Sequence, residues 1–541
     1  MIGSDAGSDG NDKGGAREPP RPNRRQWAML VVFTLSSFLV ILNAASLPIP
    51  LPSIQEDLGG TLDEITWVFG AFILTFAVFL LPFARLADIY GRRMLLIWGV
   101  TVFTLASLAA ALTPSMEFLI GALAVQGLGA AMVEPAVRAL LKATFPPERQ
   151  SLAFGVQRAG FFAAAAAGPI LSGFLTTVLS WEYVFWLNVA VGVVVLAGAV
   201  PVIPESRAQG VSRRLDWAGL LLGAAGIFFL VFPIIEGTRL GWGSPSIVGS
   251  FAASVVLLAL FVVTETRVWE PLVDLTMFKD RLFAVGNFVR GATEFASLGI
   301  FFALSHFLQA QLGYSALVAG LLLMSIIVGA LITSPIAETL SGRVDVRLLV
   351  IPGFVFVAAG TFWVAHVSPE TGWAFFIAPL AIAGAGFGAL ESPTETTMHR
   401  EVPPARSEIA WCVSYGTYLL GIGLGVAVVS GVLQSQFVAN AKDALSRTDL
   451  PPGVGQRISS SLFDGGVSGQ PAARIGGPGA AQVEELIQGA FAKAVNTALL
   501  SCVAVALLGA LVALSFSSGL KEGATDEEGA SEEQIGRRES D

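Results

Sequence analysis

The chain has 541 residues, of which 54% are hydrophobic and 13% are charged. This composition excludes a soluble domain, because no soluble protein of this size can bury so much apolar surface. The formal net charge of −9 says little about partners, since the charges are segregated by position along the chain. The two cysteines, Cys412 and Cys502, lie inside apolar runs and offer neither a disulfide framework nor a metal-binding spacing.

The polar residues 1–26 precede the first apolar run and are expected to form a disordered cytoplasmic tail. Arg24 and Arg25 are also compatible with a twin-arginine or secretory signal, but the many later apolar runs favour an uncleaved first span. A bilayer core needs about 20 apolar residues per helix. Fourteen runs meet this requirement, at about 27–47, 66–84, 95–113, 117–141, 151–177, 183–203, 217–236, 245–264, 283–308, 315–337, 348–367, 373–396, 409–437 and 495–517.

Two further polar segments follow later in the chain. Residues 440–490 are rich in Gly, Ser and Pro and are expected to form a long extracellular loop with a short helix near AQVEELIQGAF. Residues 518–541 are expected to form an acidic, disordered cytoplasmic tail. Lys and Arg concentrate in alternate short loops, with Arg239 the lone exception, so both termini are predicted to be cytoplasmic.

A long internal repeat organises the chain. Residues 126–173 recur at 383–430 with an offset of 257 residues and no gap. Gly127, Gly129, Glu134 and Gly168 correspond to Gly384, Gly386, Glu391 and Gly425. The repeat predicts an all-α membrane protein with two six-helix bundles in the same orientation, residues 27–205 and 281–517. Residues 206–280 would add an inserted helix pair.

Three segments resemble signatures of the major facilitator superfamily. FARLADIYGRR (83–93) is similar to the loop signature G-x-L-A-D-x-x-G-R-[KR], with Ala84 in place of the first Gly. AAAAGPILSG (164–173) and WEYVFWLNV (181–189) resemble the antiporter signature and the motif that follows it. With fourteen spans, the chain looks most like the drug:proton antiporter branch over residues 27–517. The resemblance implies the major facilitator fold and transport by alternating access.

Two positions depart from that branch. Asn43 stands where the branch has a membrane Asp, and Leu123 stands where an Arg precedes Q-G-x-G. In the family both groups are tied to proton coupling, so proton-driven transport would need another membrane carboxylate here.

The resemblance also implies two conformational features. Asp88, Arg92 and Arg93 would form a charged latch between helices on the inner face; the alternative is a solvated loop with topogenic arginines. Gly168, Pro169 and Gly173 would make their helix deformable or serve plain close packing, since Gly admits close approach and Pro frees a backbone carbonyl.

Charged residues inside predicted spans are the strongest functional signal, because each is costly in lipid. Three pairs have i,i+4 spacing and share a helix face: Glu134–Arg138, Arg290–Glu294 and Glu391–Glu395. The repeat aligns Arg138 with Glu395, which predicts an inner-gate contact; the alternative is that both side chains snorkel to the interface. Glu294 lies near mid-span and is the first candidate for proton coupling with Arg290 as partner, followed by Glu134 and Glu391.

These features predict a secondary active transporter in the plasma membrane, exporting hydrophobic or cationic small molecules in exchange for protons. An alternative is an importer or a lipid or metabolite carrier with non-standard or no proton coupling. A membrane enzyme has little support, because the sequence lacks the H-E-x-x-H and P-loop motifs. We expect a monomer in the lipid bilayer that uses no cofactor or metal and binds no nucleic acid.

Overall fold

The computed structural model describes residues 23–207, 216–269, 271–341, 343–400, 402–403, 406–446 and 480–516. Within these ranges the chain is helical and contains no strand, which confirms the predicted fold class. The elements are α1 (Arg24–Ser46), α2 (Leu51–Leu58), α3 (Leu62–Tyr90), α4 (Arg92–Ala111), α5 (Met116–Thr144), α6 (Pro147–Val178), α7 (Glu182–Val202), α8 (Trp217–Leu240), α9 (Pro245–Glu265), η1 (Leu275–Lys279), α10 (Arg281–His306), η2 (Phe307–Gln311), α11 (Ala316–Ser341), α12 (Arg347–Val364), α13 (Ala374–His399), α14 (Ser407–Ser446) and α16 (Ala480–Ala513).

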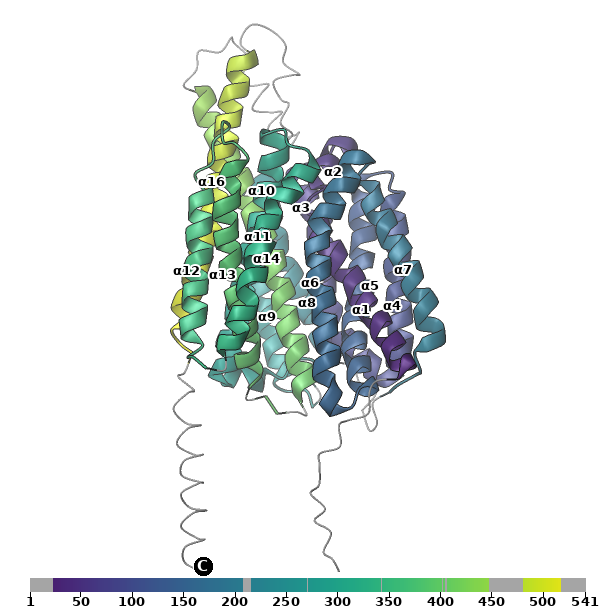
Figure 1. The fold of residues 1–541 in the computed structure, drawn as a ribbon. Coiled ribbons are helices and arrows are strands. Elements are labelled where there is room, and N and C mark those ends of the chain that lie inside the picture. The colour runs from purple at the N-terminus through teal and green to yellow at the C-terminus, as the bar shows by residue number, and fades with distance from the viewer. Residues whose placement is uncertain are drawn as a thin grey trace, which may run out of the picture.

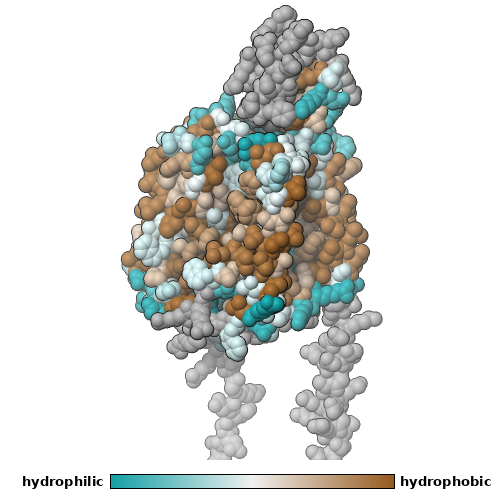
Figure 2. Space-filling view, turned by 180° about the vertical axis from the view of Figure 1, so that it is seen from behind, coloured by the Kyte–Doolittle hydropathy of each residue, from teal (hydrophilic) through white to brown (hydrophobic). Residues whose placement is uncertain are grey.

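Fourteen helices in the described part of the chain are long and apolar enough to cross a membrane, as the sequence predicted. Figure 2 shows the lateral surface as a hydrophobic belt between hydrophilic residues at the two ends of the molecule. A belt of this kind matches the apolar core of a bilayer.

The helices form two groups that lie side by side (Figure 1). α1 and α3–α7 make the first half, α10–α14 and α16 make the second, and the inserted helix α8 packs against α3 and α14. α3 against α14 and α6 against α11 form the seams between the halves. α1 begins and α16 ends at the same end of the bundle, as an even number of spans requires (Figure 1).

The repeated glycines explain why both halves pack alike. A Cβ atom at Gly127 of α5 would lie 2.3 Å from the carbonyl oxygen of Phe72 in α3. A Cβ atom at Gly384 of α13 would lie 2.0 Å from the carbonyl oxygen of Ile326 in α11. Glycine therefore lets the two backbones touch at equivalent places in the two halves.

Helix ends differ from the prediction at three places. Residues 440–446 and 480–490 are helical, because Phe437 packs on Phe491 with ring centroids 5.6 Å apart and Asn440 donates to the carbonyl oxygen of Ala490 at 3.3 Å. The predicted helix near AQVEELIQGAF is the start of α16. α1 begins at Arg24, inside the predicted disordered tail, because Asn23 forms a capping box with Gln26.

The short helix α2 was not predicted. Residues 1–22, 447–479 and 517–541, which hold most of the predicted tails and loop, lie outside the described residues.

Candidate functional site

A cavity of about 180 Å³ lies between the two halves. Aromatic rings make up much of its wall: Phe69, Phe161, Phe162, Phe301, Phe387 and Tyr418. The charged residues of its lining are Glu294 of α10 and Glu391 of α13. An apolar cavity with a few converging polar groups is the usual form of a small-molecule site.

Arg290 lies one turn before Glu294 on α10. Its guanidinium stands over the ring of Tyr418, 5.3 Å from the centroid, and it is attracted by the carboxylates of Glu294, Glu391 and Glu395. Glu391 is also attracted by Arg158 of α6, and Glu395 acts on Arg138 of α5, so guanidinium groups from both halves surround these carboxylates. The cavity lining itself carries two of the carboxylates and none of these guanidinium groups, which favours a proton or a cationic ligand there.

Glu134, which the repeat aligns with Glu391, lies in the first half and is absent from the cavity lining. Its side chain is buried and accepts a hydrogen bond of 3.2 Å from the hydroxyl of Ser37. Ser37 in turn accepts a hydrogen bond of 3.1 Å from Gln157. This carboxylate is held by the first half instead of facing the cavity.

Asn43 belongs to a chain of buried hydrogen bonds that links four helices of the first half. Asn188 donates to the side-chain oxygen of Asn43 at 2.7 Å, and Asn43 donates to Gln126 at 2.9 Å. Gln126 donates onward to Ser107 at 2.8 Å. The amide of Asn43 is thus satisfied on both sides, as a buried polar group should be.

At the end of the bundle where α1 begins, Arg138 of α5 reaches the second half through α14. Its Nε atom lies 3.5 Å from Glu408, which also pairs with Lys142. The guanidinium lies between two rings, 4.6 Å from the centroid of Trp411 and 5.2 Å from that of Phe154. Ion pairing and cation–π contact together tie the first half to α14 at this end.

The predicted partner Glu395 of α13 also attracts the guanidinium of Arg138, beside the ion pair with Glu408 of α14, so its part in an inner gate stays a prediction. The sequence argument overlooked Glu408 because this residue begins a helix and lies outside the predicted apolar run.

The predicted latch residues lie at the end of α3 and the start of α4, on either side of Gly91. Asp88 accepts from Arg92 at 2.9 Å, and Arg93 donates to the carbonyl oxygen of Val200 in α7 at 2.8 Å. Gly91 has φ +130°, and a Cβ atom there would lie 2.6 Å from the carboxylate of Glu205. Glycine is therefore required at this tight connection. All of these contacts remain within the first half.

The predicted conformational residues of α6 make close contacts with two helices. A Cβ atom at Gly168 would lie 2.7 Å from the Cβ of Ala45 in α1. A Cβ atom at Gly173 would lie 2.6 Å from the carbonyl oxygen of Ala316 in α11. A Cβ atom at Gly320 of α11 would likewise lie 2.4 Å from the carbonyl oxygen of Pro169. Small residues thus allow α6 to touch both its own half and the seam; their conformational role stays a prediction.

Contacts between the halves also occur at the other end of the bundle. Ser305 donates to the carbonyl oxygen of Pro48 at 2.8 Å, and Gln309 donates to that of Ile49 at 2.9 Å. The central cavity therefore lies between two sets of contacts that each join the first half to the second.

A stack of aromatic rings on α14 was missed in the sequence. Trp411, Tyr415 and Tyr418 are stacked with centroids 4.9 and 5.3 Å apart, and they connect Arg138 to Arg290. Their spacing of four and three residues puts them on one helix face, which is the signal that could have revealed the stack.

Comparisons with known proteins agree with this architecture. The family model described as Major Facilitator Superfamily matches residues 33–426. Multidrug resistance protein Stp of Mycobacterium tuberculosis (strain CDC 1551 / Oshkosh) is 31% identical over 456 residues, which cover 84% of each protein. Tetracenomycin C resistance and export protein of Streptomyces glaucescens is 28% identical over 493 residues, covering 91% of each. Puromycin resistance protein pur8 of Streptomyces alboniger is 32% identical over 416 residues, covering 76% of this chain and 82% of that protein.

A solved structure of a bacterial homolog to the human lysosomal transporter Spinster, inward-facing and unoccupied, superposes with a TM-score of 0.63 at 16% identity. The match covers 92% of this chain and 98% of the other. At this identity the likeness supports the fold alone.

Proposed function

This chain belongs to the Major Facilitator Superfamily, and we propose that it exports hydrophobic or cationic small molecules, drugs among them, in exchange for protons. The observation that carries the proposal is the cavity between the halves, with aromatic walls and two carboxylates. The names of the relatives as resistance and export proteins support the direction of transport. We place the protein in the plasma membrane with both termini in the cytoplasm, following the distribution of Lys and Arg in the short loops.

Alternating access follows from the contacts at both ends of the cavity. The contacts of Arg138 and Lys142 with Glu408 would break to open the cavity to the cytoplasm. The contacts of Ser305 with Pro48 and of Gln309 with Ile49 would break to open the cavity to the outside. Each half can keep its packing during this exchange, because the close glycine contacts within a half are independent of the seams.

Glu294 is the proposed coupling residue. Its carboxylate lines the cavity, close enough to Glu391 for the two charges to repel each other, while Arg290 attracts it. A proton on Glu294 relieves that repulsion, and a bound cationic substrate does the same. A proton and a cationic substrate therefore compete for the same negatively charged site at Glu294 and Glu391. This competition is the physical basis of exchange.

Proteoliposomes test this proposal. We expect Glu294→Gln to abolish accumulation of puromycin or ethidium driven by a pH gradient while leaving downhill exchange of the same compound largely intact. Glu338→Gln, which changes an exposed carboxylate on α11, is the matched control and should behave like the parent protein. Undiminished gradient-driven accumulation by Glu294→Gln would rule this residue out. The same result with Glu134, Glu294 and Glu391 all changed to Gln would remove the carboxylate mechanism.

A further inference from the structure

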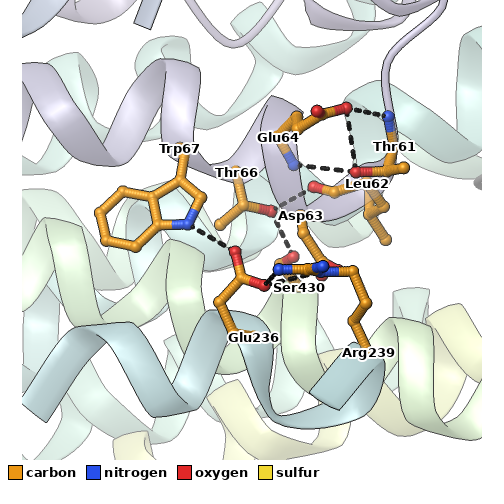
Figure 3. A network of polar contacts seen from close by, with 9 residues as sticks. All are labelled: Thr61, Leu62, Asp63, Glu64, Thr66, Trp67, Glu236, Arg239 and Ser430. Atoms are coloured by element: carbon orange, nitrogen blue, oxygen red, sulfur yellow. Dashed lines mark hydrogen bonds and ion pairs between the residues drawn. The ribbon is translucent and has the colours of Figure 1, made fainter. Parts of the chain in front are cut away.

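The inserted helix α8 meets both halves at the end of the bundle that the proposed orientation places outside. Trp67 of α3 packs on Phe228 of α8 with ring centroids 6.0 Å apart. A Cβ atom at Gly431 of α14 would lie 2.8 Å from the carbonyl oxygen of Ile234 in α8. At the same level, the hydroxyl of Thr66 in α3 meets that of Ser430 in α14 at 2.5 Å (Figure 3). α8 therefore closes over the seam between the halves.

A buried charge cluster accompanies this contact (Figure 3). Asp63 of α3 is 2% exposed and Glu236 of α8 is 7% exposed. Glu236 accepts hydrogen bonds from Trp67 at 3.0 Å and from the Nε atom of Arg239 at 2.8 Å. Arg239 Nε also lies 3.8 Å from Asp63. Arg239, which breaks the pattern of basic residues in the loops, thus has two buried carboxylates as partners.

The two carboxylates are unequally satisfied. Glu236 has an indole and a guanidinium as donors, whereas both side-chain oxygens of Asp63 are buried and receive no hydrogen bond. Gln434 of α14 faces Asp63 and stabilises its charge as a weak donor outside normal hydrogen-bond geometry, and its own side-chain oxygen is buried and unpaired. A buried carboxylate with one weak donor is costly, so Asp63 is the member of the cluster that is incompletely satisfied.

The charges around Asp63 do not balance. The charged groups that act on it are Glu236 and Arg239 from α8 and Glu64 from its own helix. Glu64 points back to Thr61 and receives the backbone N–H of that residue at 2.8 Å, so it is engaged in capping α3 (Figure 3). The Arg239 side chain is half-exposed and reaches the two buried carboxylates from the surface, so one guanidinium serves both of them. Burial of the excess negative charge requires one more positive charge, and the smallest that fits is a proton.

We infer that Asp63 is a proton-binding site whose occupation from the outer side allows α8 to close the outer seam. With Asp63 protonated, the cluster of Asp63, Glu236 and Arg239 is neutral and the Thr66–Ser430 contact can form. With Asp63 ionised, the carboxylate is better placed in water, which requires the seam to be open. Proton uptake and closure of the outer side are therefore linked. The inference goes beyond the proposed function, because it assigns a role to the inserted helix and a second proton site remote from Glu294.

Disulfide trapping tests this linkage without substrate or gradient. Thr66 and Ser430 are both changed to Cys in a background with Cys412→Ala and Cys502→Ala, so that a disulfide reports the closed seam. Cells carrying this pair are oxidised from outside at pH 8 and at pH 6. The ratio between two variants at the same pH cancels the pH dependence of thiol oxidation itself.

Asn at position 63 is permanently neutral. At pH 8 the disulfide should therefore form at least threefold faster in Asp63→Asn than in Glu64→Gln. At pH 6 the ratio of these two rates should be near one. Glu64→Gln is the matched control, since it changes an adjacent carboxylate that caps α3 and has the smallest effect on Asp63 of the charged groups around it. Glu236→Gln should match Asp63→Asn, because one guanidinium then balances one carboxylate. Combining the two changes leaves Arg239 unbalanced and should lower the ratio again.

A ratio of one at pH 8 for both Asp63→Asn and Glu236→Gln would overturn the inference. So would a raised ratio that persists unchanged at pH 6, since this would indicate a packing effect instead of a proton. If replacing external Na⁺ by choline lowers trapping in Glu64→Gln at pH 6, the bound cation is sodium and the proton assignment is wrong. Failure of the proposed export would appear separately, in the proteoliposome assay, and would leave these ratios unchanged.

Discussion

Gly127→Ala is expected to destabilise the first half because a single methyl group meets backbone there. The new Cβ would lie 2.3 Å from the carbonyl oxygen of Phe72 and 2.1 Å from the hydroxyl of Thr75. Thr75 cannot simply turn away, since it donates to the carbonyl oxygen of Ala124 in α5 at 2.9 Å. The backbones must separate by about 1 Å to reach an ordinary contact distance, and overpacking of this kind costs about 1–3 kcal/mol.

The matched control, Gly121, lies six residues earlier on the same helix (127 − 121). A Cβ atom at Gly121 would meet nothing within 4 Å, so Gly121→Ala should show only the gain of about 1 kcal/mol from replacing Gly in a helix. Both variants share that gain, so their free energies of unfolding should differ by roughly 1–3 kcal/mol, which is the overpacking cost alone. Thermal unfolding of the detergent-purified proteins, followed by tryptophan fluorescence, measures this difference.

The repeat supplies an independent check. Gly384→Ala places a Cβ atom 2.0 Å from the carbonyl oxygen of Ile326 and should lower the half-unfolding temperature as Gly127→Ala does. Equal half-unfolding temperatures for Gly127→Ala and Gly121→Ala would refute the reasoning, because the close backbone contact would then relax at no cost.

Three further predictions concern other parts of the molecule. Asn43→Leu should destabilise the first half by about 1–3 kcal/mol for each amide that it leaves unpaired, measured by the same thermal unfolding. Arg138→Glu combined with Glu408→Arg should restore more transport than Arg138→Glu combined with Glu395→Arg; the reverse order would assign the inner gate to α13. A cysteine at Ser315 should react with an impermeant thiol reagent added outside, whereas one at Arg207 should not, and the opposite pattern would invert the proposed topology.

The fold was predictable because it follows from two sequence signals, the apolar runs and the internal repeat. Apolar runs of membrane-spanning length give the fourteen spans, and the offset of 257 residues gives the two halves. Helix ends were less predictable, because they depend on contacts between distant residues. α14 continues to Ser446 because Phe437 and Asn440 contact residues of α16. These partners lie about 50 residues later in the chain, so no local sequence pattern indicates the pairing.

The cavity residues were predictable in part. Glu294 and Glu391 stood out because carboxylates are rare in apolar runs, and both line the cavity. Asn43 stood out as a missing acid, but its partners Gln126 and Asn188 are 83 and 145 residues away. No local pattern connects such residues, so the hydrogen-bonded chain became visible only when the helices were packed together.

The two halves share a packing plan but differ in where they place charge. α1 begins at Arg24 and α10 at Arg281, an offset of 257 residues (281 − 24) that also relates Ser37 to Glu294 (294 − 37). In the first half, the carboxylate of Glu134 meets the hydroxyl of Ser37. In the second half, its counterpart Glu391 lines the cavity together with a second carboxylate, that of Glu294, and the two charges repel each other. The repeat thus keeps one acid in both halves and adds the other in the second half alone. A cationic group of a substrate should therefore approach α10 and α13, while the rings of α6 in the first half hold its apolar body.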